Sequence, residues 1–153
     1  MMAKTHMAFG LLFGLASLYV VNTENKLIFL AIAVFASLLP DIDHEESYIN
    51  HKLSILKPLS HFFKHRGILH TIWVPLAAWL ILWFGFGINY GSAVFIGYFA
   101  HLFSDGLTKN GVNIIHPLSQ VRFQGFIQTG GVFEVVVFIF VLALDAALAL
   151  RVI

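Results

Sequence analysis

The chain has 153 residues, of which 59% are hydrophobic and 11% are charged, and its mean hydropathy is +0.85. Soluble domains are nearer half apolar and one quarter charged, so this composition excludes a protein whose whole surface faces water. The net charge of +1 gives no extended basic surface, and we expect no nucleic-acid partner. Cysteine is absent, which excludes disulfides and thiolate metal sites.

Five apolar stretches predict five helices, over residues 7–21, 27–40, 68–88, 90–103 and 132–150. The third and fifth have the roughly 20 residues needed to cross about 30 Å of hydrocarbon, whereas the others are shorter. The first could also be a signal peptide, but no small-x-small cleavage site follows it, which favours a retained helix. We therefore expect an all-α, polytopic membrane helical bundle that forms a single membrane-embedded domain over 1–153.

Basic residues give this bundle an orientation. Five crossings place the N-terminus and the segments 41–67 and 104–131 on one side of the membrane. That side carries seven basic residues and the other carries Lys26 and Arg151; the seven are Lys4, Lys52, Lys57, Lys64, Arg66, Lys109 and Arg122. The positive-inside rule then places the long loops in the cytoplasm, which predicts a protein of the bacterial inner membrane.

Two loop segments have patterns of their own. Residues 52–64 carry leucine, phenylalanine and lysine at helical spacing, typical of an amphipathic helix that lies among lipid headgroups. An ordinary surface helix that caps the bundle explains this pattern equally well. Residues 121–131 alternate loosely about a glycine and predict a small hairpin.

Imidazole and carboxylate side chains gather at the helix ends predicted to face the cytoplasm. His101 and Asp105 are spaced i, i+4, so one helical face can present both to one ion. Nitrogen and oxygen ligands without sulfur favour zinc, with manganese or iron as alternatives, and the number of ligands allows two or more ions. The candidate metal ligands are His6, Asp41, Asp43, His65, His70, His101, Asp105 and Glu134.

Simpler explanations compete at individual positions. A lone aspartate at a helix end is usually a cap, and Glu134 could merely favour a helix N-terminus by its charge. Asp145 lies far from the other acids and is expected to pack within the bundle or to extend outward. The remaining histidines are expected outside the site or are undecided: His51, His61 and His116 outside, His44 undecided.

Five motifs, taken in order along nearly the whole chain, resemble one known family. They are Thr5-His6, Leu39-Pro-Asp-Ile-Asp43, His65-Arg-Gly-x-x-His70, His101-x-x-x-Asp105, and Thr129-Gly-Gly-x-x-Glu134. Together they resemble the LexA-regulated inner-membrane proteins classed as metal-dependent hydrolases. That family is distantly similar to the zinc-dependent phospholipase C and P1 nuclease group of α-helical phosphoesterases.

The resemblance implies a metal-dependent hydrolase that acts on a phosphoester, with a membrane lipid or lipid-linked phosphate as substrate. Asp41 or Asp43 would act as general base, and Arg66, with Lys64, would hold the phosphate. The sequence departs from the phospholipases in having Gly130 where they carry a histidine, and it shows no evident equivalent of their N-terminal amine ligand. Two alternatives remain open, a metal or proton transporter and a non-catalytic scaffold stabilised by metal.

Overall fold

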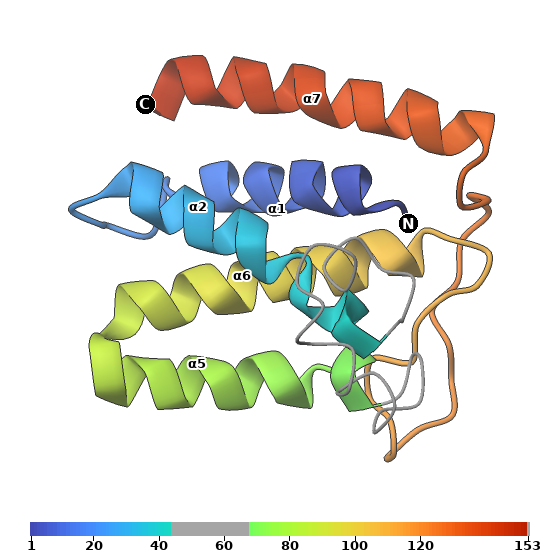
Figure 1. The fold of residues 1–153 in the computed structure, drawn as a ribbon, viewed down its shortest axis with the longest axis horizontal. Coiled ribbons are helices and arrows are strands. Elements are labelled where there is room, and N and C mark those ends of the chain that lie inside the picture. The colour runs from blue at the N-terminus through green and yellow to red at the C-terminus, as the bar shows by residue number, and fades with distance from the viewer. Residues whose placement is uncertain (44–67, 153) are drawn as a thin grey trace.

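The computed structural model describes residues 1–43 and 68–152 (Figure 1). The described residues contain no β-strand, which confirms the all-α prediction for them. The third stretch becomes a helix only from Trp73, with Pro75 in its first turn, where the missing N–H costs nothing. The α-helices are α1 (Ala3–Ser17), α2 (Lys26–Ala36), α5 (Trp73–Phe86), α6 (Ile88–Gly106) and α7 (Val132–Val152), with 3₁₀ turns η1 (Leu39–Asp43) and η3 (Ile68–His70).

Successive helices run in opposite directions (Figure 1). Asn25 begins α2 by accepting a hydrogen bond from the amide of Ile28, and Gly87, with φ of 101°, turns the chain from α5 into α6. Short connections of this kind make α1 and α2, and α5 and α6, antiparallel pairs. As a result α1, α5 and α7 begin at the end of the bundle where α2 and α6 finish.

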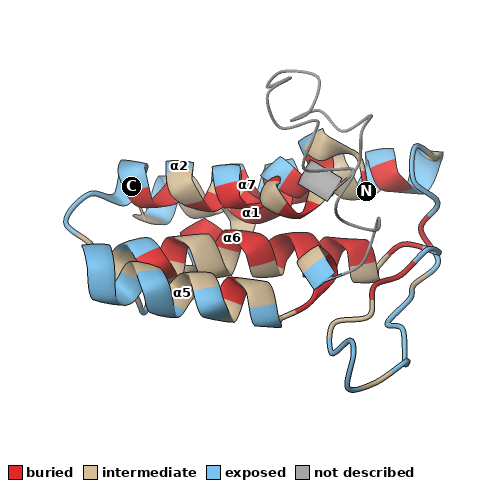
Figure 2. Cartoon of the chain, turned by 60° about the horizontal axis from the view of Figure 1, so that its bottom comes forward, coloured by how far each residue is buried: buried red, intermediate tan, exposed pale blue. Residues whose placement is uncertain are grey.

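Helix α6 is the centre of the bundle and packs against α1, α2 and α5, while α7 packs on α1. Burial follows this arrangement, since buried residues run along α6 and the outer side of α5 is exposed (Figure 2). The closest approach is between α6 and α2, where a Cβ on Gly97 would lie 2.0 Å from the carbonyl oxygen of Ala33. Only glycine fits there, so Gly97 sets the distance between these two helices.

Large apolar side chains remain exposed along α5 and α7, among them Trp83, Phe84, Ile139 and Phe140. Apolar surface on this scale is unusual for a monomer in water. By length and composition, α7 is the one described helix able to cross a membrane, and α5 is apolar but has 14 residues. The five predicted crossings therefore stay a prediction.

The segment between α6 and α7 differs from the prediction. The prediction of a hairpin over 121–131 is wrong, because residues of this segment pair instead with the segment that follows α6. Val112 forms an antiparallel bridge with Phe123, and Thr108 forms a parallel bridge with Ile127. The amphipathic helix predicted over 52–64 lies outside the described residues.

Asp145 is buried within α7, with 4% of its surface exposed, so it does not extend outward. Neither carboxylate oxygen has a hydrogen-bond partner among the described residues. Glu134, on the same helix, is also buried, but both of its oxygens accept hydrogen bonds. The helix thus contains one satisfied and one unsatisfied carboxylate.

We expect Gly97→Ala to destabilise the protein by about 1–3 kcal/mol, because the new methyl group meets backbone that cannot move aside without separating α2 from α6. Gly85→Ala is the matched control, since nothing lies within 4 Å of that position. Thermal unfolding in detergent measures both. Equal melting temperatures for the two variants would contradict the proposed role of Gly97.

Asp145→Leu should stabilise the protein by about 1–3 kcal/mol, because it removes a buried polar group that has no hydrogen bond. Glu134→Leu on the same helix should have the opposite effect, since it leaves three donors without their acceptor. Melting temperatures of the two variants in one detergent decide the matter. A destabilised Asp145→Leu would show that the carboxylate is satisfied in the folded protein.

Candidate metal centre

Five of the predicted ligands meet at the end of the bundle where α2 and α6 finish. His6 comes from the first turns of α1, Asp41 from η1, His70 from η3, and His101 and Asp105 from the last turns of α6. Four of the side chains are almost wholly buried, whereas the side chain of Asp41 is 22% exposed. We call these five residues the His/Asp cluster.

Within the His/Asp cluster, imidazole nitrogens face carboxylate oxygens at distances longer than hydrogen bonds. Asp105 lies between three histidines, with oxygens 3.6 Å from Nε2 of His6, 3.8 Å from Nε2 of His70 and 3.9 Å from Nε2 of His101. Asp41 lies 3.9 Å from Nε2 of His6 and 3.7 Å from Nε2 of His101. The rings of His6 and His101 stack with their centres 3.8 Å apart.

Hydrogen bonds behind the rings determine which nitrogen of two histidines carries the proton. Nδ1 of His101 lies 2.8 Å from the carbonyl oxygen of Ser37, which can only accept, so Nδ1 must donate. The hydroxyl of Ser104 donates to the carbonyl of His101, so its oxygen accepts from Nδ1 of His6 at 2.8 Å. Both neutral rings therefore direct an Nε2 lone pair into the cluster.

This arrangement fits a divalent metal ion. Nε2 of His6 and Nε2 of His101 are buried and have no hydrogen-bond partner among the described residues, which is costly unless another ligand is bound. Two ligands of a tetrahedral zinc ion, each about 2.1 Å from it, lie about 3.4 Å apart, close to the spacings in the cluster. Histidines that bind a metal through one ring nitrogen usually donate the N–H of the other nitrogen to an oxygen atom, which fixes the orientation of the ring.

The cluster contains two overlapping groups of ligand atoms. Within each group, all the atoms lie within 4.8 Å of one another. One contains His6, Asp41 and His101, and the other contains His70, His101 and Asp105. His101 belongs to both, and one nitrogen lone pair binds one ion. The two groups therefore cannot both use His101, and the prediction of two or more ions stays a prediction.

Glu134 is not part of either group. Its Oε1 accepts hydrogen bonds from the amide of Met2 at 2.6 Å and from the hydroxyl of Thr5 at 2.9 Å. Its Oε2 accepts from the amide of Gly130 at 2.6 Å, as in a capping interaction at a helix start. Glu134 thus connects the start of α7 to the start of α1, the helix that carries His6.

The nitrogen of Met1 reaches the cluster and contacts Oδ1 of Asp105 at 2.5 Å. The sequence alone showed no evident amine ligand, because nothing in it indicates that the first residue folds back on the end of α6. The structure therefore places an amine beside the carboxylate that all three histidines share. Among the described residues, the amino group of Met1 is the cationic group that contacts the cluster.

The remaining predicted site residues are placed as follows. The side chain of Asp43, and the whole of His44, His51, His61, Lys64, His65 and Arg66, lie outside the described residues. His116 is exposed in the loop after α6, as expected for a histidine outside the site. Sequence reasoning missed Ser37 and Ser104; the only signal was the position of Ser104 one turn after His101, on the same helical face.

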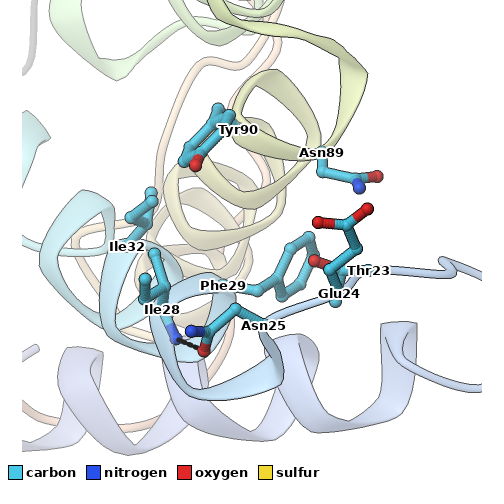
Figure 3. Close-up of a pocket in the computed structure, with 8 residues that line it drawn as sticks. All are labelled: Thr23, Glu24, Asn25, Ile28, Phe29, Ile32, Asn89 and Tyr90. Carbon is cyan, nitrogen blue, oxygen red and sulfur yellow. Dashed lines mark hydrogen bonds between the residues drawn. The ribbon is translucent and has the colours of Figure 1, made fainter.

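The opposite end of the bundle has different chemistry. A pocket of about 170 Å³ lies there between α2 and the start of α6, and it is lined in part by Glu24, Asn25, Asn89 and Tyr90 (Figure 3). Glu24 is its one ionisable acid, and it contains no histidine. The ligand-type residues of the described chain are therefore concentrated at the end that holds the His/Asp cluster.

The fold and the site define a class, an all-α protein with a buried His/Asp cluster at one end of its helices. A family model described as YdjM inner membrane protein matches residues 1–152. Because the match covers nearly the whole chain, the protein belongs to the YdjM inner membrane protein family. The prediction of an inner-membrane protein is confirmed at this level, and the hydrolase activity stays a prediction.

Individual relatives agree with this assignment. The chain is 33% identical over 94 residues to the inner membrane protein YdjM of Escherichia coli, a match that covers 56% of this chain and 47% of that protein. It therefore spans about half the length of that relative. It is 32% identical over 137 residues to the uncharacterized protein YvsG of Bacillus subtilis, which covers 88% of this chain and 85% of YvsG. No solved structure matches.

Protein purified without chelator should contain divalent metal, and the double variant His101→Ala, Asp105→Ala should contain none. Ser104→Ala should bind metal about 10–100-fold more weakly, because it removes the acceptor that orients His6. His116→Ala is the control and should bind like the wild type. Elemental analysis and competition with a chelating dye measure content and affinity. Metal-free wild type, or full occupancy in the double variant, would rule out the site.

Proposed function

We propose that this protein is an integral-membrane, metal-dependent hydrolase that acts on a phosphoester of a membrane lipid or lipid-linked phosphate. One observation carries the proposal, namely that His6 and His101 are buried with their Nδ1 protons already committed and their Nε2 lone pairs directed at two shared carboxylates. Such an arrangement suits a divalent cation, for which zinc fits the ligand set. The hydrolase class is supported by the resemblance of the five motifs.

We further propose that the helices cross the bacterial inner membrane with the His/Asp cluster at the cytoplasmic side. Membership of an inner-membrane family, the exposed apolar side chains of α5 and α7, and the opposite directions of successive helices support this topology. The orientation rests on the excess of basic residues in the segments at the cluster end. A substrate that diffuses within the membrane would then reach the cluster from the headgroup layer.

The residues of the cluster have separable roles in this mechanism. The buried His6, His70, His101 and Asp105 would supply metal ligands, and a bound ion would supply a water of lowered pKa and would neutralise charge on the phosphate. Asp41 is the most exposed of the five and would accept the proton of the attacking water while contacting two of the histidines. Arg66 keeps its predicted role in binding the phosphate.

Metal-loaded protein in lipid micelles should hydrolyse a chromogenic phosphodiester or one member of a phospholipid panel. EDTA should abolish this activity, and Asp41→Ala should lower kcat about 10²–10⁴-fold, because the general base is lost. His116→Ala is the control, since this residue is exposed and belongs to neither ligand group. Release of the chromophore and of lipid phosphate measures the rates.

The outcomes separate the alternatives. Activity that survives EDTA or Asp41→Ala would contradict the mechanism. Stoichiometric metal without hydrolysis of any substrate in the panel would indicate a metal-stabilised scaffold. Metal or proton flux into vesicles without hydrolysis would indicate a transporter.

A further inference from the structure

An apolar groove of about 540 Å³ runs along one side of the bundle. Its floor is α1, with Met7, Leu11 and Leu15; α2 forms one wall, and Ala149 is the one residue of α7 that lines the other side. Ala31 of α2 and Ala149 of α7 are the small residues that line these walls. The groove exists because α2 and α7 both pack on α1 without packing closely on each other.

The two ends of the groove differ. Leu38 lies three residues before Asp41, and Met7 follows His6 in the chain, so one end of the groove lies at the end of the bundle that holds the His/Asp cluster, although no cluster residue lines it. At the other end Lys26, just before Leu27, donates a hydrogen bond of 2.6 Å to the carbonyl of Val152 and connects α2 to α7. The groove thus ends beside this contact on one side and at the cluster end of the bundle on the other.

The length of the groove matches a lipid chain. At a rise of about 1.5 Å per residue, the α2 part of this wall, from Leu27 to Phe35, is about 12 Å long, and Leu38 extends it beyond the end of the helix. One leaflet of a bilayer whose hydrocarbon core is about 30 Å thick has a depth of about 15 Å. All the residues that line the groove are apolar, so an occupant needs no hydrogen bonds within it. A single acyl chain has this length and this chemistry.

We propose that the groove between α2 and α7 binds one acyl chain of a phospholipid, so that its phosphate headgroup lies at the His/Asp cluster. This inference rests on the proposed function and specifies its substrate class as a lipid that carries at least one long acyl chain. Binding energy along the groove then positions the phosphoester without any polar contact to the chain. Ala31 and Ala149 determine the space for the chain, and larger side chains there exclude it.

The test uses phosphatidic acid with a photoreactive diazirine in one acyl chain, at low mole fraction in phosphatidylcholine vesicles that contain the metal-loaded protein. Mass spectrometry maps the labelled residues. Most label should fall on the groove-lining parts of α1, α2 and α7. The double variant Ala31→Trp, Ala149→Trp should lose at least five-fold of this label. Ala143→Trp is the matched control, because Ala143 is exposed on α7 and does not line the groove.

A second probe tests the position of the headgroup. Diacylglycerol with the same diazirine chain has no phosphate, so it should label the groove less than phosphatidic acid does. The variant His101→Ala, Asp105→Ala should remove this difference. Label spread evenly over the exposed faces of α5 and α7, unaffected by the tryptophan substitutions, would overturn the proposal. So would equal groove labelling by the two probes in the wild type.

Hydrolysis assays distinguish this proposal from the proposed function. If the groove is labelled as expected but no phosphoester is hydrolysed, the lipid site stands and the enzymatic function fails. If the groove variants hydrolyse a water-soluble phosphodiester normally but lose activity on long-chain lipid, both stand. Unchanged activity of these variants on long-chain lipid overturns the acyl-chain site alone.

Discussion

The hydrogen bond from Nδ1 of His101 to the carbonyl of Ser37 is the interaction on which the candidate metal centre depends. It forms because α6 approaches α2 closely at Gly97, one turn before His101, where a larger residue would collide with the backbone of Ala33. The same contact leaves Nε2 of His101 facing the carboxylates. A packing constraint between two helices thus determines the tautomer of a buried histidine, and with it the chemistry of the site.

The other components of the site follow from this centre. Ser104 connects α6 to α1, since its hydroxyl donates a hydrogen bond to the carbonyl of His101 and accepts one from Nδ1 of His6. Glu134 connects α7 to the same end of α1 through its bonds to Met2 and Thr5. The cost of burying these polar groups is offset because nearly every one has a defined partner. Among the described residues of the site, Nε2 of His6 and Nε2 of His101 are the exceptions, and they mark where a ligand belongs.

The position of the cluster at one end of the bundle suits chemistry at a membrane surface. Along the helices the side chains are mostly apolar, with Asp145 of α7 as an exception, whereas the cluster lies where the chain enters and leaves the helices. The apolar groove beside α1 reaches the same end, so the proposed acyl-chain site and the candidate metal ligands lie at one end of the bundle. In this member of the YdjM inner membrane protein family, a buried His/Asp cluster thus lies at one end of a small helical domain.

The apolar stretches and the i, i+4 spacing of His101 and Asp105 were sufficient to predict the five helices and most of the cluster, because hydropathy and helical periodicity are local properties. The motif predicts Glu134 as a ligand, yet its Oε1 accepts hydrogen bonds from Met2 and Thr5, which are distant in the chain. The contact of Met1 with Asp105, the support from Ser37 and the groove between α2 and α7 also depend on how helices pack. No local pattern encodes these contacts, since each brings together residues far apart in the sequence. The sequence by itself determined which ligands are available, and only the tertiary structure decided which of them meet.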